Sequence, residues 1–248
     1  MSEKTVLYDV SNQVATITLN RPDRLNALTR QVEDELAEAM TRADESDEIR
    51  VIILTGAGRG FCAGADMESL GQIGSVDWET VDLEELKERI VPPVPRPNTA
   101  VDFQKKYSYF PAIRKPIIGA INGAAVGLGF VLPLYCDIRI ASDKARFGTA
   151  FAQRGLIAEH GVSWMLPRLV GISNALDLLY SARLIEAEEA LRMGLVSRVV
   201  PHDELIATVG EYARQLASSV SPRSLKVIKK QVYEALFQTL GDRSEERR

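Results

Sequence analysis

Two short apolar segments, each followed directly by a glycine-containing loop, constrain the fold of this 248-residue chain more than any other feature. The first covers residues 50–55 and leads into Gly56, and the second covers residues 116–121 and leads into Asn122 and Gly123. Continuous apolar strands of this length are typical of a mostly parallel sheet that is buried on both faces. The recurrence of the unit at similar spacing predicts an α/β fold built as a right-handed spiral of turns.

Hydrophobic periodicity predicts the elements around this sheet. Residues 4–20 alternate between polar and apolar side chains on both sides of residues 11–13, which is a hairpin signal. Thr29 is expected to open a helix, because apolar residues follow it at helical spacing. We also expect helices over 124–135, 203–218 and 222–240 and from about residue 162, a helix C-cap at Gly194, and strands over 136–141, 145–147 and 196–200.

Composition excludes several classes of protein. The chain carries 30 basic and 34 acidic side chains, a net charge of −4, and it has no basic tract of the kind that nucleic-acid binders use. No apolar run approaches the roughly 20 residues of a membrane-spanning helix. Two cysteines and two histidines supply neither a disulfide framework nor a zinc cluster. These features predict a cytoplasmic, metal-free enzyme that binds neither nucleic acid nor a membrane.

Two glycine-rich loops, residues 60–67 and 121–129, are each expected to follow a buried strand and to open a helix. At such places backbone N–H groups lack partners and the helix dipole adds positive potential. If the two loops converge, their N–H groups would form a hole for a developing oxyanion. The equally weighted alternative is that these glycines only permit close packing of helix on sheet.

Several short motifs occur in a characteristic order along the chain. They are residues 19–22 (LNRP), 26–28 (NAL), 61–66 (FCAGAD), 115–116 (KP), 122–123 (NG), 136–138 (CDI), 147–148 (FG), 166–169 (LPRL) and 190–196 (ALRMGLV). Together they resemble the enoyl-CoA hydratase/isomerase (crotonase) superfamily over about residues 5–235.

The resemblance implies a spiral of ββα units with a helical C-terminal region that forms trimers. The corresponding division places an acyl-CoA-binding core at residues 1–195 and the C-terminal helical region at 196–248. It further implies an acyl-CoA substrate, no cofactor apart from the coenzyme A of that substrate, and a homotrimer or a dimer of trimers.

The resemblance also implies which residues form the site. The backbone N–H groups of Ala65 and Leu128 would form the oxyanion hole for the thioester carbonyl. The residues expected around the substrate and its CoA are Arg24, Ala27, Ala63, Gly64, Asp66, Met67 and Gly127.

The chain departs from the hydratase pattern at the two acidic positions, which hold Val131 and Phe151. Neither side chain moves a proton, whereas hydration needs one group to activate water and another to supply the α-proton. Glu159 corresponds to an acidic residue of dienoyl-CoA isomerases and is the expected proton-transfer group. His160 would orient it, share its proton or cap the following helix; a charged His160 would lower the pKa of Glu159.

Three readings of the function follow. The first is isomerisation or hydration of an unsaturated acyl-CoA through a thioester enolate. The second is a catalytically silent acyl-CoA-binding subunit. The third is a decarboxylase or C–C hydrolase on the same scaffold.

Residues 71–110 form an insertion with glycines and a proline-rich run at residues 92–97. A loop this long inside a compact domain is usually functional or disordered. We predict a lid over the acyl pocket, with Tyr107, Tyr109 and Phe110 supplying apolar surface where the chain returns.

Overall fold

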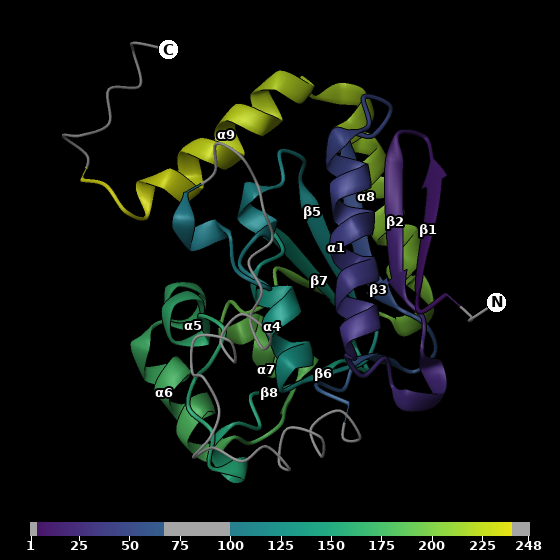
Figure 1. Ribbon diagram of the computed structural model, residues 1–248. Helices are drawn as coiled ribbons and strands as arrows, with labels where there is room; N and C mark the ends of the chain where they lie inside the picture. The colour runs from purple at the N-terminus through teal and green to yellow at the C-terminus, as the bar shows by residue number, and fades with distance from the viewer. Residues whose placement is uncertain (1–3, 67–99, 240–248) are drawn as a thin grey trace, which may run out of the picture.

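The computed structural model describes residues 4–66 and 100–239, which form two mixed sheets and the helices around them (Figure 1). The larger sheet has the order β1 (Val6–Ser11), β2 (Val14–Leu19), β3 (Val51–Gly56), β5 (Ile117–Ile121), β7 (Ile138–Ser142) and β10 (Arg198–Val200). The smaller sheet has the order β4 (Gly60–Cys62), β6 (Ala124–Val126), β8 (Arg146–Gly148) and β9 (Ile185–Glu186). All neighbouring strands are parallel except β1 with β2 and β8 with β9.

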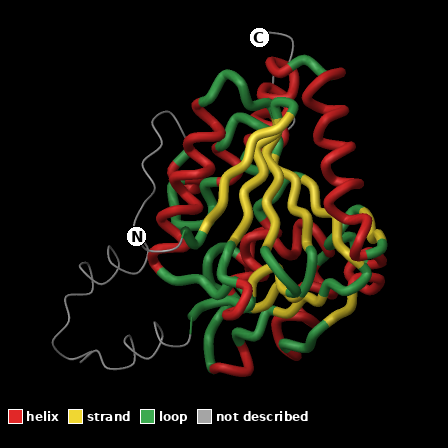
Figure 2. The backbone as a smooth tube through the Cα atoms, turned by 90° about the vertical axis from the view of Figure 1, so that its right-hand side faces the viewer, coloured by secondary structure: helices red, strands yellow, loops and turns green. Residues whose placement is uncertain are grey.

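Helices cover both faces of the larger sheet (Figure 2). The α-helices in the described part of the chain are α1 (Arg30–Glu45), α4 (Leu128–Leu134), α5 (Val162–Val170), α6 (Ile172–Ser181), α7 (Ala187–Arg192), α8 (Leu205–Ser219) and α9 (Pro222–Ala235). Ile52 and Leu54 of β3 share a core cluster with α1, whereas Val51 and Ile53 share another with α8. Because successive side chains of a strand point to opposite faces, an apolar run buries both faces. The predicted parallel sheet is therefore confirmed.

Three inner strands of the larger sheet each pass, after a short connection, into a strand of the smaller sheet. β3 leads to β4, β5 to β6, and β7 to β8. This repeated step is the spiral that the sequence predicts. The division of the chain at residue 195 stays a prediction; in the structure, the region beyond it supplies β10 to the larger sheet and α8 to one of its faces.

The local predictions hold in most places. Asn12 and Gln13 form the hairpin turn with positive φ angles of 51° and 65°. The side chain of Thr29 accepts a hydrogen bond from the N–H of Val32 and caps α1. Gly194 follows α7 with a φ of 80°, a conformation that ends many helices.

Two predicted boundaries are wrong. The helix expected from residue 124 begins at Leu128, because Ala124–Val126 pair with β4 and β8 instead. Gly127 separates the strand from the helix with φ 56° and ψ −124°, which only glycine adopts readily. The last helix ends at Ala235 rather than at residue 240.

A buried ion pair fastens α9 to the larger sheet. Lys229 Nζ lies 2.8 Å from Asp137 Oδ2, which also accepts a hydrogen bond from the N–H of Ile117. Asp137 Oδ1 accepts a hydrogen bond of 2.9 Å from the hydroxyl of Tyr233. The side chain of Lys229 is only 6% exposed, so removing its partner would leave an uncompensated buried charge.

We expect Asp137→Ala to lower the free energy of unfolding by about 3 kcal/mol or more, since breaking one side of a buried pair has this effect. Tyr233→Phe removes a single hydrogen bond to a charged group and should cost about 1.5–3 kcal/mol. Urea denaturation measures both. If Asp137→Ala lowers the free energy of unfolding by less than Tyr233→Phe does, Asp137 is not the anchor of α9.

No helix within the described ranges is long and apolar enough to cross a membrane. Among the same residues, no cluster of three or more His, Cys, Asp and Glu side chains is placed to hold a metal ion.

Candidate active site

The backbone N–H groups of Ala65 and Leu128 lie at the ends of neighbouring strands. β4 and β6 run in parallel with Cys62 opposite Ala125, and each donor comes three residues after this pair. Leu128 is the first residue of α4, where an N–H group has no partner within the helix. Among residues 4–66 and 100–239, neither N–H group has a hydrogen-bond acceptor. Within these residues, both donors are therefore available to a ligand atom.

Gly64 allows the two donor segments to approach each other. It has a φ of 101°, and a Cβ atom at this position would lie 2.8 Å from the carbonyl oxygen of Val126 and 3.4 Å from the nitrogen of Leu128. Any larger residue would push the segments apart. The close-packing alternative for these glycines therefore holds at Gly64, where it brings the segment of Ala65 next to the nitrogen of Leu128.

The residues expected around CoA surround this pair of donors, with different exposure. Arg24 is exposed at the end of a 3-10 turn, Ala27 is buried, and Ala63 is half-buried after β4. Gly127 precedes α4 directly. Met67 lies outside the described residues.

Asp66, which is predicted to lie near CoA, forms an ion pair within the protein that the sequence does not predict. Its Oδ2 lies 2.8 Å from Nη1 of Arg21, and the same nitrogen donates to the carbonyl oxygen of Ala27 at 2.7 Å. The pair ties the loop before α1 to the segment that carries Ala65. Its effect is to hold one of the two donor segments in place.

Asn26 fixes the same loop from the inside. It is 1% exposed, its side-chain amide donates to the carbonyl oxygens of Ala57 and Gly60, and its Oδ1 accepts from the N–H of Arg21. Asn26 also has a φ of 56°, which asparagine adopts more readily than most residues. In the sequence, Asn26 stands out only as part of the motif at residues 26–28, and that motif does not predict this role.

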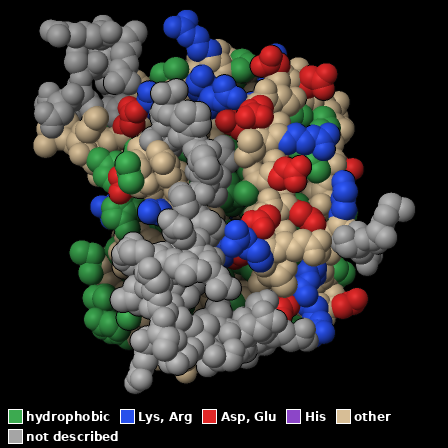
Figure 3. All heavy atoms as spheres, in the orientation of Figure 1, with side chains coloured by type: hydrophobic (Ala, Val, Ile, Leu, Met, Phe, Trp, Pro, Cys, Tyr) green, Lys and Arg blue, Asp and Glu red, His purple; other side chains and the backbone are tan. Residues whose placement is uncertain are grey.

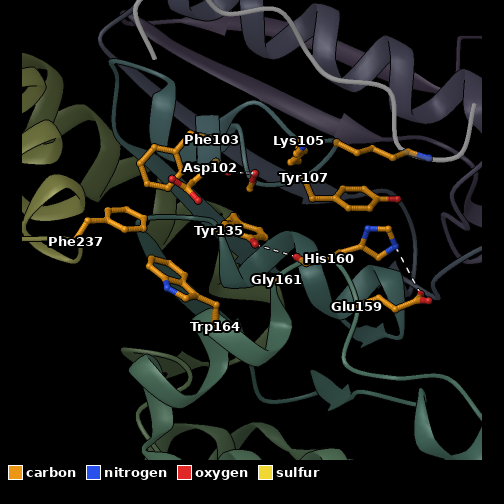
Figure 4. A pocket seen from close by; sticks show the side chains of 12 residues that line it. Asp102, Phe103, Lys105, Tyr107, Tyr135, Glu159, His160, Gly161, Trp164 and Phe237 are labelled. Carbon is orange, nitrogen blue, oxygen red and sulfur yellow. Dashed lines mark hydrogen bonds and ion pairs between the residues drawn. The ribbon is translucent and has the colours of Figure 1, made fainter. Parts of the chain in front are cut away.

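A cavity of about 560 Å³ lies between α5, the segment after α9 and residues 102–108. Ligand pockets usually measure roughly 300–1,000 Å³. We call it the aromatic cavity, because five of the described residues that line it are Phe103, Tyr107, Tyr135, Trp164 and Phe237 (Figure 4). Glu159 and His160, the two residues expected to carry out chemistry, also line it.

The aromatic cavity and the two donors are at opposite ends of α4. Leu128 opens this helix, and Tyr135 is its C-cap. Seven residues of helix separate them, or about 10 Å at a rise of 1.5 Å per residue. The structure therefore brings Ala65 to Leu128 and Glu159 to His160, but Ala65 and Leu128 do not line the aromatic cavity.

A cluster of three polar side chains, unforeseen from the sequence, lies between these two places. The Tyr107 hydroxyl donates a hydrogen bond to Glu33 in the first turn of α1, and Lys106 Nζ lies 2.6 Å from the other oxygen of Glu33. Burial, with the nearby carboxylate of Glu33, raises the pKa of Tyr107 well above its ordinary value. Tyr107 therefore stays a hydrogen-bond donor across the physiological range of pH.

The predicted lid can be followed only at its end. Of residues 71–110, those from 100 to 110 are described. Tyr107 lines the aromatic cavity as expected, whereas Tyr109 and Phe110 are buried in the main core. The lid itself falls largely on residues outside the described part and stays a prediction.

Glu159 and His160 form a loose pair before α5. His160 Nε2 lies 3.8 Å from Glu159 Oε2, and the side chain of Glu159 is 39% exposed while that of His160 is 15% exposed. The imidazole packs edge-on against the ring of Tyr107, at 4.9 Å between centroids. The His160 carbonyl accepts a hydrogen bond from the Tyr135 hydroxyl, which helps to hold a φ of 54° at this residue.

The structure favours a neutral His160. Burial, assisted by the nearby ammonium group of Lys106, lowers the pKa of His160 from 6.5 to about 4. The imidazole is thus neutral near neutrality and exerts no charge on Glu159. The sequence could not show this, because the groups that act on the ring, Tyr107 and Lys106, lie more than 50 residues away along the chain.

We expect this neutral histidine to make the protein sensitive to acid. The pKa of His160 is lower in the folded state than in the unfolded state. The stability that the neutral imidazole contributes is therefore complete above pH 6.5 and is lost as the pH falls towards about 4. The loss should reach about 3 kcal/mol, since each pKa unit corresponds to about 1.4 kcal/mol.

His160→Asn is the matched variant, because asparagine tolerates a positive φ and does not titrate. Denaturant titrations at several pH values should give a shallower decline between pH 6.5 and 4 for His160→Asn than for the unmodified protein. Equal slopes would mean that the imidazole is not neutralised by burial.

Val131 and Phe151, which replace the hydratase acids, are both buried. Val131 lies within α4 and Phe151 directly precedes a 3-10 turn, and both belong to the main core cluster. Neither position offers a group that titrates.

The two-sheet spiral and the comparison with known proteins together define the class of protein. The chain belongs to the enoyl-CoA hydratase/isomerase family, whose model matches residues 9–247. A probable enoyl-CoA hydratase of Mycobacterium bovis is 34% identical over 242 residues, which cover 98% of this chain and 86% of that protein.

A second relative carries a different activity in its name. The 1,2-epoxyphenylacetyl-CoA isomerase of Escherichia coli is 36% identical over 242 residues, covering 95% of this chain and 84% of that protein. Among solved structures, an enoyl-CoA hydratase subunit of Geobacillus kaustophilus superposes with a TM-score of 0.82 at 32% identity. That match covers 96% of this chain and 84% of the other.

Proposed function

We propose that this protein binds an unsaturated acyl-CoA, stabilises its thioester enolate and moves a double bond within the acyl group. The observation that carries the proposal is the pair of backbone N–H groups at Ala65 and Leu128, brought together by the parallel register of β4 and β6. Preorganised donors aimed at a developing oxyanion are often the largest single contribution to such catalysis. The family membership and the acyl-CoA names of the relatives support the substrate class.

Glu159 is the proposed proton-transfer group. It is partly exposed, and it lines the aromatic cavity next to the neutral His160. A single carboxylate is sufficient to remove a proton from one carbon and return it to another. His160 would act as a positioning residue rather than as a second base.

Isomerisation is favoured over hydration by the two buried apolar residues Val131 and Phe151. Hydration needs a second acid or base to activate water, and neither side chain provides one. The same observation favours a second candidate, a silent acyl-CoA-binding subunit, if Glu159 proves not to reach the substrate. A decarboxylase or C–C hydrolase stays a third reading.

Product analysis separates these readings. The full chain is incubated with 2-enoyl-CoA and 3-enoyl-CoA thioesters, and the products are followed by NMR and mass spectrometry. An isomerase yields the other positional isomer with unchanged mass, whereas a hydratase yields an acyl-CoA that has gained one water. Tight binding of these thioesters without any product would favour the silent subunit and contradict the proposed catalysis.

We also propose that the chain forms a homotrimer or a dimer of trimers. Hydrophobic side chains gather over α5 and α6 (Figure 3). Ile172, Leu176 and Tyr180 lie four residues apart on α6 and are all exposed. Ile206 of α8 and Val232 of α9 are exposed as well. Light scattering coupled to size-exclusion chromatography measures the assembly, and a monomer at micromolar concentration would contradict it.

A further inference from the structure

The walls of the aromatic cavity indicate what kind of acyl group it accepts. We propose that it holds a planar aromatic ring at the distal end of the acyl chain, so that the substrates are aryl-substituted acyl-CoA thioesters. This inference rests on the proposed function, because it assigns the acyl group of the same site.

Rings from separate parts of the chain meet in this cavity. Trp164 of α5 stacks on Phe237 after α9, with 5.3 Å between centroids and 14° between planes. Phe237 in turn meets Phe103 nearly at right angles, at 5.8 Å and 67°. Figure 4 shows Phe103 and Trp164 on either side of Phe237, with Tyr135 facing them. The wall thus consists of aromatic rings from separate segments, and such rings are the partners that a further aromatic ring prefers.

The phenol groups of the cavity are occupied within the protein. The hydroxyl of Tyr135 donates to the carbonyl oxygen of His160 at 2.9 Å, and the hydroxyl of Tyr107 donates to Glu33. What these tyrosines offer to a ligand is therefore their carbon surface. An apolar ring matches that surface better than an acyl end that carries a hydroxyl or carboxylate.

The cavity lies at a suitable distance from the two donors. Leu128 and Tyr135 are about 10 Å apart along α4. On the other side, Leu28 is bridged to Ala65, and Glu33 follows it in the first turn of α1 and holds Tyr107. A thioester held by Ala65 and Leu128 would extend its acyl chain past Tyr107, placing a ring a few carbons further on among Phe103, Trp164 and Phe237.

The test compares three saturated thioesters with the same number of carbons: 4-phenylbutyryl-CoA, 4-cyclohexylbutyryl-CoA and decanoyl-CoA. Isothermal titration calorimetry with the full chain gives each affinity, and saturated chains keep the measurement independent of turnover. We expect 4-phenylbutyryl-CoA to bind about tenfold more tightly than its cyclohexyl counterpart, because ring–ring contacts add to the gain from apolar burial.

Three variants locate the preference. Trp164→Leu and Phe237→Leu should each reduce the phenyl-over-cyclohexyl ratio to about two or less, because each removes ring contacts from the wall. Tyr212→Leu, which changes an aromatic residue on α8 that does not line the cavity, should leave the ratio unchanged. Circular dichroism confirms that each variant is folded.

The possible results distinguish the aromatic-ring proposal from the proposed acyl-CoA function. If the thioesters bind but the phenyl compound has no advantage, the aromatic-ring proposal is overturned and the acyl-CoA function stands. A preference that survives both Trp164→Leu and Phe237→Leu also overturns it, since the ring then lies elsewhere. If none of the thioesters binds, the proposed acyl-CoA function itself fails.

Discussion

Replacing Leu128 with proline should reduce kcat by about 10²–10³-fold, the usual effect of losing one oxyanion donor. Proline lacks the backbone N–H but fits the first position of a helix, where its fixed φ is favourable. Gly127 before it has the mirror image of an extended conformation, which a glycine before proline can keep. The loss should therefore appear in the chemical step rather than in folding. Steady-state kinetics on the best substrate found, together with thermal unfolding, measures both.

Leu128→Ala is the matched control, because it shortens the same side chain but keeps the N–H group. It should retain most of the activity. Equal activity of Leu128→Pro and Leu128→Ala, in folded proteins, would remove Leu128 from the proposed oxyanion hole.

Glu159→Gln should cut turnover by about 10²-fold or more while leaving binding of the CoA thioester nearly intact. The substitution keeps the size of the side chain and removes the base. His160→Asn should have a smaller effect if the imidazole only positions Glu159. A fall in kcat with little change in KM would be its characteristic sign, because a general disturbance of the fold would change both.

Glu188→Gln provides the control for Glu159→Gln, since Glu188 is an exposed carboxylate on α7, away from the aromatic cavity. It should leave kcat unchanged. Turnover in Glu159→Gln comparable to that of the unmodified protein would eliminate Glu159 as the proton-transfer group and favour the silent subunit or a base supplied by the substrate.

The sheet and the two donors were predictable because they depend on local patterns. Residues 51–56 and 117–121 are almost entirely apolar, and a buried parallel strand is what such runs form. The donors are backbone groups at strand ends, so their place follows from the loops that carry Ala65 and Leu128. The short strand Ala124–Val126 was missed because three small residues carry no periodic signal and are held only by their neighbours in the smaller sheet.

The polar cluster and the cavity depend on contacts between distant parts of the chain. Tyr107 and Glu33 are 74 residues apart in sequence, and nothing in either segment points to the other. The aromatic cavity draws its rings from residues 103 to 237 in the same way. The neutral state of His160 belongs to this group as well, because it arises from burial against Tyr107 and from Lys106. Such features emerge only when the tertiary structure is known.

A crystal structure with a saturated acyl-CoA thioester bound would show directly whether Ala65 and Leu128 form the oxyanion hole. The thioester carbonyl oxygen should lie about 3 Å from both the nitrogen of Ala65 and the nitrogen of Leu128, at hydrogen-bond distance. A thioester bound with its carbonyl away from these two N–H groups would contradict the proposed oxyanion hole.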